Sequence, residues 1–125
     1  MDANFQDNEL LYRSIKPDVT FWKESGILSS AAFKDSKGLS VDRAAGRCKP
    51  LCVEFLLSRF PQSCVASVKV EMCKEVDALV KYAPIDCESE KNEYHSEIHK
   101  SESVCKLTDG QAKKLARLAT IEYGN

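Results

Sequence analysis

The most constraining feature of this chain is the alternation of apolar and polar residues across residues 63–71, SCVASVKVE, in which only Val65 departs from the polar series. Cys64, Ala66, Val68 and Val70 lie two residues apart, which is the period of a β-strand that buries one face. A single strand cannot bury that face alone, so the rest of the chain has to supply a sheet and a layer that covers it.

Two segments have the pattern of helices that can cover such a sheet. Residues 49–59 predict a helix that is apolar on much of its surface, with Pro50 in its first turn and Pro61 ending it. Thr108 and Gln111 match a capping box. The apolar residues after this box recur at helical spacing, and we expect this helix to end near residues 122–124.

Other segments predict additional strands. They are residues 10–15, 39–42 and 76–84, while residues 94–99 fit either a strand or a helix. This order predicts an α+β fold, a mostly antiparallel sheet with two main helices packed on one side. Residues 1–9 are polar and are expected to form a flexible N-terminal arm, followed by a single domain over residues 10–125.

The charge balance excludes some classes of partner. The 125 residues carry 18 basic and 19 acidic side chains, a formal net charge of −1. Proteins dedicated to nucleic acids or membrane surfaces depend on an excess of Lys and Arg, so neither partner is expected. The polar, acidic N-terminus does not resemble a signal peptide, and we expect a cytoplasmic protein. Neither a cofactor nor an oligomeric state follows from the sequence.

Six cysteines are a high number for a chain of this length. We interpret them mainly as small buried apolar residues that stay reduced in the cytoplasm. One alternative is a zinc-stabilised domain that uses Cys48, Cys52, His95 and His99, because each pair has the spacing of ligands on one helix face. Another alternative is a disulfide framework, which would require an exported chain.

The sequence lacks the established catalytic motifs GxGxxG, GxxxxGK[ST], HExxH and GxSxG. Three polar segments flanked by apolar residues are the remaining candidates. Arg13 lies at a strand end, where its guanidinium suits a phosphate or carboxylate. Ser30 belongs to a Ser-Ser pair, and His95 with Glu97 combines an imidazole and a carboxylate.

We therefore predict a catalytic set of Arg13, Ser30, His95 and Glu97, and assign no metal ligand to it. The neighbouring Tyr12, Ser29 and Phe33 are predicted to contact a ligand. Some of these residues also have a structural explanation, since Arg13 fits an ion pair, Ser29 fits a helix cap and the histidines fit a polar strand face.

Several segments resemble a group of small bacterial and phage-type proteins of unassigned function. They are LLYRSIKPD, GILSSAAFKDSKGLSVDR, YHSEIHKS and LTDGQAKKLARLA, from Leu10 to Ala119. In that group a strand ending in Arg, an S-S-x-A-F-K segment before L-S-V and a late H-x-E-I segment follow one another in this order. The resemblance implies no particular activity.

The chain also resembles ADP-ribosyltransferase-like folds, including toxins of the RES type. Matched residue by residue, Arg13 would hold a pyrophosphate, Ser29 or Ser30 would be the central serine, and Glu97 would act at the ribose. The chain departs from that pattern because it is short, has no Thr between its serines and contains few glycines.

These observations lead to three hypotheses about function. The first is a protein-interaction component of a phage-related or toxin–antitoxin-like system, with a protein as its partner. The second is an NAD-like nucleotide-binding or transferase site built on Arg13, Ser29, Ser30, His95 and Glu97. The third is the zinc-stabilised domain.

Overall fold

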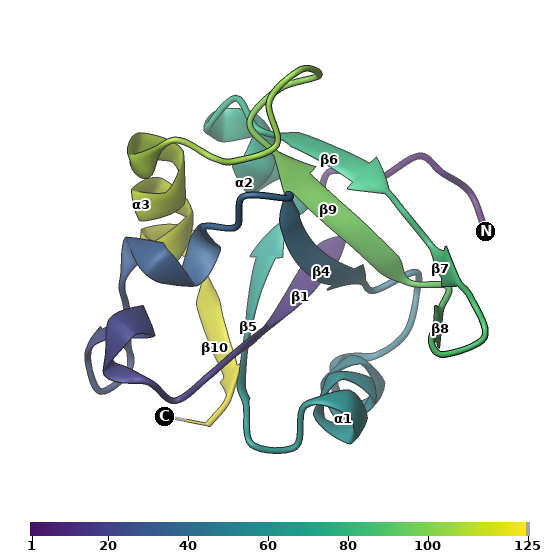
Figure 1. Cartoon of the computed structure of the whole chain (residues 1–125), viewed down its shortest axis with the longest axis horizontal. Helices are drawn as coiled ribbons and strands as arrows, with labels where there is room; N and C mark the ends of the chain where they lie inside the picture. Colours follow the sequence, from purple (N-terminus) through teal and green to yellow (C-terminus); the bar gives the residue numbers. More distant parts are fainter. Residues whose placement is uncertain (125) are drawn as a thin grey trace.

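The strand predicted around residue 66 is an interior strand of a six-stranded sheet in the computed structural model, which describes residues 1–124 (Figure 1). The strand order is β10-β5-β1-β4-β9-β6, and every neighbouring pair is antiparallel. The α+β class with a mostly antiparallel sheet is confirmed. The strands of this sheet are β1 (Leu10–Ile15), β4 (Leu39–Arg43), β5 (Cys64–Lys69), β6 (Leu79–Tyr82), β9 (His95–His99) and β10 (Thr120–Tyr123).

Three α-helices, two 3₁₀ turns and two small hairpins complete the described part of the chain. The helices are α1 (Lys49–Arg59), α2 (Val70–Glu75) and α3 (Asp109–Leu118), and the 3₁₀ turns are η1 (Val19–Phe21) and η2 (Ser30–Phe33). The hairpins pair β2 (Trp22–Glu24) with β3 (Ile27–Leu28), and β7 (Ile85–Asp86) with β8 (Lys91–Asn92).

The two longer helices begin as the sequence predicts. Pro50 lies in the first turn of α1. At α3 the Thr108 hydroxyl accepts a hydrogen bond from the Gln111 backbone at 3.1 Å, and the Gln111 side chain accepts one from the Thr108 backbone at 2.9 Å. This reciprocal pair satisfies donors that a helix start leaves free.

The two main helices cover opposite faces of the sheet, whereas the sequence analysis placed them on one side. Val65 packs in a cluster with Cys52 and Leu56 of α1. Its neighbour Ala66 belongs to the cluster that contains Leu115 of α3. Successive strand residues point to opposite faces. The helices lie on opposite faces because β5 is buried on both faces, and each face of the sheet needs a covering layer.

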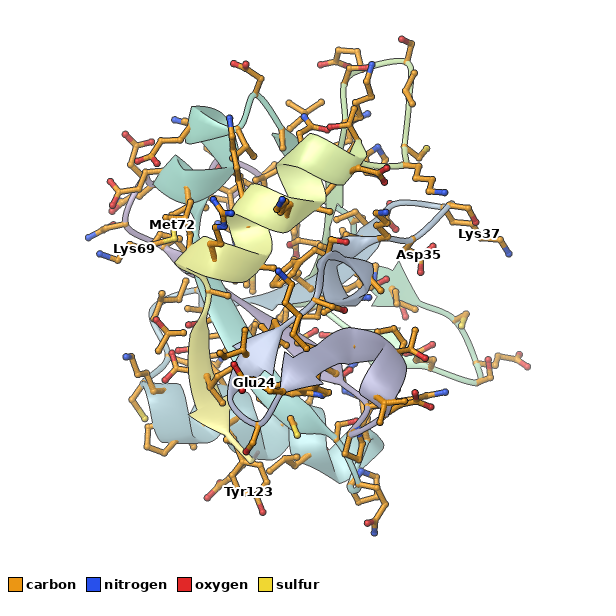
Figure 2. All side chains as sticks on the ribbon, turned by 90° about the vertical axis from the view of Figure 1, so that its left-hand side faces the viewer. Glu24, Asp35, Lys37, Lys69, Met72 and Tyr123 are labelled. Carbon is orange, nitrogen blue, oxygen red and sulfur yellow. The ribbon has the colours of Figure 1, made fainter. Side chains whose placement is uncertain are left out.

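Figure 2 views the molecule from the α3 side, with α3 lying in front of the sheet. The η2 turn packs against α3 and adds Ala32 and Phe33 to the same apolar cluster. Phe33, predicted to contact a ligand, is therefore buried in the core with 1% of its surface exposed.

Three element boundaries differ from those predicted, and one is the strand predicted at residues 76–84, which is confined to Leu79–Tyr82. Residues 70 and 71, predicted to end a strand, instead begin α2, and Val70 and Cys73, three residues apart, are its buried positions. The last helix ends at Leu118, and Thr120–Tyr123 forms β10. The residues of β10 favour strand structure, and β10 pairs with the edge of β5 that would otherwise lack a partner.

The N-terminal residues, expected to be a flexible arm, make specific contacts with Arg43. The Arg43 guanidinium donates hydrogen bonds to the backbone carbonyls of Asp2 and Asn4 and forms an ion pair with Glu9 at 2.9 Å. It also lies 4.1 Å from the centre of the Phe5 ring. Residues 2–9 are thus attached to the end of β4.

Cysteine burial follows the core. Cys52, Cys64 and Cys73 are buried, and burial raises the pKa of each thiol, that of Cys73 to about 12. Cys48, Cys87 and Cys105 are exposed, and none of the six forms a disulfide. A buried thiol with a raised pKa stays protonated and unreactive. No helix among the described residues has the length and apolar character needed to span a membrane.

Candidate functional site

The candidate site lies where the sheet opens between β1 and β4. Along β1, all six residues pair with β5, from Leu10 with Lys69 to Ile15 with Cys64. Against β4, only Leu11 and Tyr12 are paired, and the two strands diverge beyond them (Figure 1). Where the backbone pairing between β1 and β4 ends, a gap remains between the two strands that can hold side chains and a ligand.

A cavity of about 220 Å³ lies at this opening. β1, β4 and β9 contribute Tyr12, Arg13, Ser40, Asp42 and His95 to its lining. The C-terminal end of α1 and the segment that carries the β7–β8 hairpin provide the remaining wall. The structure thus brings two of the predicted catalytic residues, Arg13 and His95, to one cavity.

Arg13 bridges the gap between the strands. Its Nε donates a hydrogen bond to the Ala32 carbonyl at 2.6 Å, and one Nη donates to the Ser40 carbonyl at 3.0 Å. No carboxylate lies within ion-pair distance of Arg13 in residues 1–124. Burial lowers the pKa of Arg13 to about 10, against a smaller opposite influence of Asp35. The guanidinium therefore remains a cation at neutral pH and is only partly hydrated.

His95 is oriented by two hydrogen bonds. Its Nδ1 lies 2.8 Å from the Ala83 carbonyl, and its Nε2 lies 3.2 Å from the Ser40 hydroxyl. A carbonyl oxygen can only accept, so Nδ1 carries the proton and, in the neutral ring, Nε2 is an acceptor. The Ser40 hydroxyl then donates to His95.

Asp42 is the buried anion of the site, with 2% of its surface exposed. One carboxylate oxygen accepts a hydrogen bond from the Asn92 amide at 2.8 Å, and the other pairs with Arg59 of α1. Asn92 in turn accepts from the Tyr94 backbone at 3.0 Å. The network ties α1 and β8 to β4 and fixes the walls of the cavity.

Two polar atoms in this region are buried without a hydrogen-bond partner, the Tyr12 hydroxyl and the Arg59 Nε. Burial raises the pKa of the Tyr12 phenol, so it remains neutral. Unsatisfied buried polar atoms cost free energy. Tyr12, predicted to contact a ligand, borders the cavity but is fully buried, in the cluster beneath α1.

The other predicted site residues lie elsewhere. The Ser29 hydroxyl donates to the Thr20 carbonyl at 2.7 Å, which secures η1 against η2. Ser30 lines a separate cavity with residues of α3. The Glu97 carboxylate lies 2.8 Å from His99 Nε2, and Glu97 does not line the cavity. The predicted catalytic set is therefore only half assembled.

The zinc alternative lacks geometric support. No group of three or more His, Cys, Asp or Glu side chains able to hold a metal ion occurs in the part of the chain that the structure describes. Cys48 and Cys52 lie at the start of α1, whereas His95 and His99 lie on β9. The two pairs are thus not a joint ligand set.

Comparison with known proteins adds no relative. No family model, curated protein or solved structure matched the chain. The function must therefore be inferred from the geometry of the site.

Sequence reasoning missed Ser40, Asp42, Arg59 and Asn92. Ser40 and Asp42 had a signal, because both are the polar positions of the alternating LSVD strand and must share a face. Arg59 and Asn92 had none, because their role depends on how α1 and β8 pack against β4.

Proposed function

We propose that the cavity between β1 and β4 binds the phosphate or carboxylate group of a small anionic ligand. The observation that supports this proposal is Arg13, a partly buried cation at the cavity whose hydrogen bonds go to backbone carbonyls. A guanidinium without a carboxylate partner is suited to bind an anion in a bidentate manner. Ser40 and His95 also line this cavity.

The volume limits what the cavity holds. At about 220 Å³ it is smaller than the 300–1,000 Å³ typical of sites for drug-sized ligands. One anionic group fits inside, and the remainder of a nucleotide such as NAD would lie outside. The resemblance to ADP-ribosyltransferase-like folds motivates NAD and ADP-ribose as ligands to be tested.

Thermal unfolding with added ligand tests this proposal. Inorganic phosphate, acetate, ADP-ribose and NAD are added separately, and at least one should raise the melting temperature. Near-saturation at 100 times Kd contributes about 2.7 kcal/mol, which corresponds to a shift of roughly 10 °C for a chain of this length. Arg13→Gln should lose the ligand-dependent shift, while Arg117→Gln on the exposed side of α3 should keep it. An absence of any shift with all four ligands would contradict the proposal.

A groove of about 780 Å³ between α1 and the β7–β8 hairpin supports a protein partner as the second candidate function. Leu51, Phe55, Ile85 and Tyr94 contribute apolar surface to it, and Leu51 is 53% exposed. Large exposed apolar side chains in a groove are typical of interaction sites. The phage-related or toxin–antitoxin-like setting remains a prediction from the resemblance.

Affinity purification from the source organism tests this second candidate. The wild-type chain should recover a partner in stoichiometric amount, and Leu51→Glu should reduce that recovery at least tenfold because it places a charge in the apolar groove. Glu54→Gln, an exposed change on the same helix, serves as the matched control. A purified chain that retains no partner would remove this candidate.

A further inference from the structure

Ser40 and His95 have the relative placement of a nucleophile and its general base. Ser40 is exposed and lines the cavity, and its hydroxyl donates to His95 Nε2 at 3.2 Å. The Ala83 carbonyl holds the opposite ring nitrogen at 2.8 Å. Nucleophile, base and a third group that orients the base form the general arrangement of covalent catalysis by serine.

The sheet makes this placement rigid. Ser40 pairs with Glu97 and Asp42 pairs with His95, so Ser40 and His95 are diagonal neighbours on the same face of β4 and β9. Ala83 follows β6, the strand beyond β9, and its backbone amide donates to the His95 carbonyl at 3.1 Å. Ser40 and His95 are therefore carried by adjacent strands, which hold a site more precisely than loops, and Ala83 directly follows the next strand.

Arg13 lies beside the nucleophile, because its Nη donates to the carbonyl of Ser40 itself at 3.0 Å. Arg13 leaves β1 on the face that carries Ala66, whereas the Ser40 hydroxyl lies on the face of Tyr12 and Asp42, so the two groups reach the cavity from opposite faces of the sheet. Electrostatic stabilisation of developing negative charge is usually the largest contribution to acyl and phosphoryl transfer. The Arg13 cation lines the same cavity and adds positive potential there.

We propose that Ser40 is a nucleophile, activated by His95, that takes the acyl group from an ester carrying a carboxylate or phosphate. The substrate class depends on the anion binding proposed above, whereas the nucleophile depends only on the Ser40–His95–Ala83 geometry. The two parts can therefore fail independently.

The reaction has two steps, acylation of Ser40 and hydrolysis of the acyl-serine. Ser40 Oγ forms a bond to the acyl carbon as its proton moves to His95 Nε2, and the alcohol leaves with that proton. Water then attacks the acyl-serine, giving its proton to His95 and its hydroxyl to the acyl carbon. Ser40 Oγ recovers the proton as the acid departs. The sum is hydrolysis of one ester by one water.

A neutral alkyl fluorophosphonate tests the nucleophile directly. Attack by Ser40 Oγ forms an O–P bond and expels fluoride, so intact-mass spectrometry should show one adduct, and peptide mapping should place it on Ser40. Ser40→Ala should abolish this adduct. Ser58→Ala, which removes a hydroxyl bonded to the Phe55 carbonyl on α1, should be labelled at the wild-type rate.

The role of His95 requires a measurement that a merely structural role would not change. His95→Ala should slow labelling at least about 100-fold, and added imidazole should restore part of the rate. Circular dichroism and the melting temperature of each variant establish that it is folded. A lack of labelling of the folded wild-type protein, adducts at other residues, or unchanged labelling of Ser40→Ala or His95→Ala would overturn the proposal.

Protection by phosphate separates the two parts. If Arg13 binds anions beside Ser40, inorganic phosphate should slow labelling of the wild-type protein in a concentration-dependent manner. Labelling of Ser40 without any protection would support the nucleophile and overturn the anionic substrate class. Phosphate-dependent thermal stabilisation without labelling would support the anion site and overturn the nucleophile.

Discussion

Gly38→Ala is expected to destabilise the fold by about 3 kcal/mol. Gly38 has a φ of +102°, in a region that residues with a side chain rarely adopt. An added Cβ would lie 2.5 Å from Nε2 and 2.8 Å from Cδ2 of His99. The His99 ring is buried and bonded to Glu97, so it cannot move away without breaking that bond.

The turn that contains Gly38 explains the close approach. The Asp35 side chain accepts from the Lys37 backbone at 2.9 Å, and the Asp35 carbonyl accepts from the Gly38 backbone at 3.3 Å. Figure 2 shows Asp35 and Lys37 at the outer edge of the molecule, on the turn that leads into β4. Gly38 thus faces inward, over the His99–Glu97 pair.

Urea unfolding of Gly38→Ala checks this prediction, with Gly46→Ala as the matched control. Gly46 also has a positive φ, +79°, but an added Cβ meets nothing within 4 Å. Gly46→Ala should therefore lower the free energy of unfolding by only about 1 kcal/mol, the cost of a positive φ for a residue with a side chain. Equal losses in the two variants would mean that the contact with His99 contributes nothing.

Asp42→Ala is the second substitution with a large expected effect, a loss of about 3 kcal/mol or more. Removing the carboxylate leaves the Arg59 guanidinium, whose side chain is 21% exposed, without its counter-charge. The buried Asn92 amide loses its acceptor at the same time. Breaking a buried pair on one side is costly because the remaining charge is not rehydrated.

Chemical denaturation of Asp42→Ala beside Asp86→Ala isolates the effect of burial. Asp86 pairs with Lys91 on the surface, and the two side chains are 85% and 77% exposed. An exposed pair of this kind contributes little, so Asp86→Ala should unfold close to the wild-type midpoint. A stability of Asp42→Ala within about 0.5 kcal/mol of wild type would contradict the buried network.

The parts of the fold that the sequence predicts best depend on local patterns. Alternation identified β5 and β4, and the capping box placed the start of α3 at Thr108. The element α2 was missed because Val70 continues the alternation of β5 by one step. Both main helices were predicted on one side of the sheet, because local alternation does not show that a strand is buried on both faces. In β5, Val65 on one face is as apolar as Ala66 on the other.

The site was predictable only in part, for a related reason. Arg13 and His95 were identified from their own segments, and the pairing of β4 between β1 and β9 brings them together. Ser29 and Ser30 were expected beside them, but the η2 turn faces α3 instead. Arg59 enters the site through packing of α1, which no pattern near residue 59 encodes.

The short pairing between β1 and β4 has a mechanical consequence for the whole molecule. The sheet consists of two three-stranded ribbons, β10-β5-β1 and β4-β9-β6, which are joined by backbone pairing at Leu11 and Tyr12 and by a hydrogen bond from the Ala44 amide to the Leu10 carbonyl. Such a seam is the natural hinge line of the sheet, because fewer backbone hydrogen bonds resist bending there than within either ribbon. Rotation about it changes the separation of Arg13 from His95, so the stiffness of the seam sets how precisely the two halves of the site face each other.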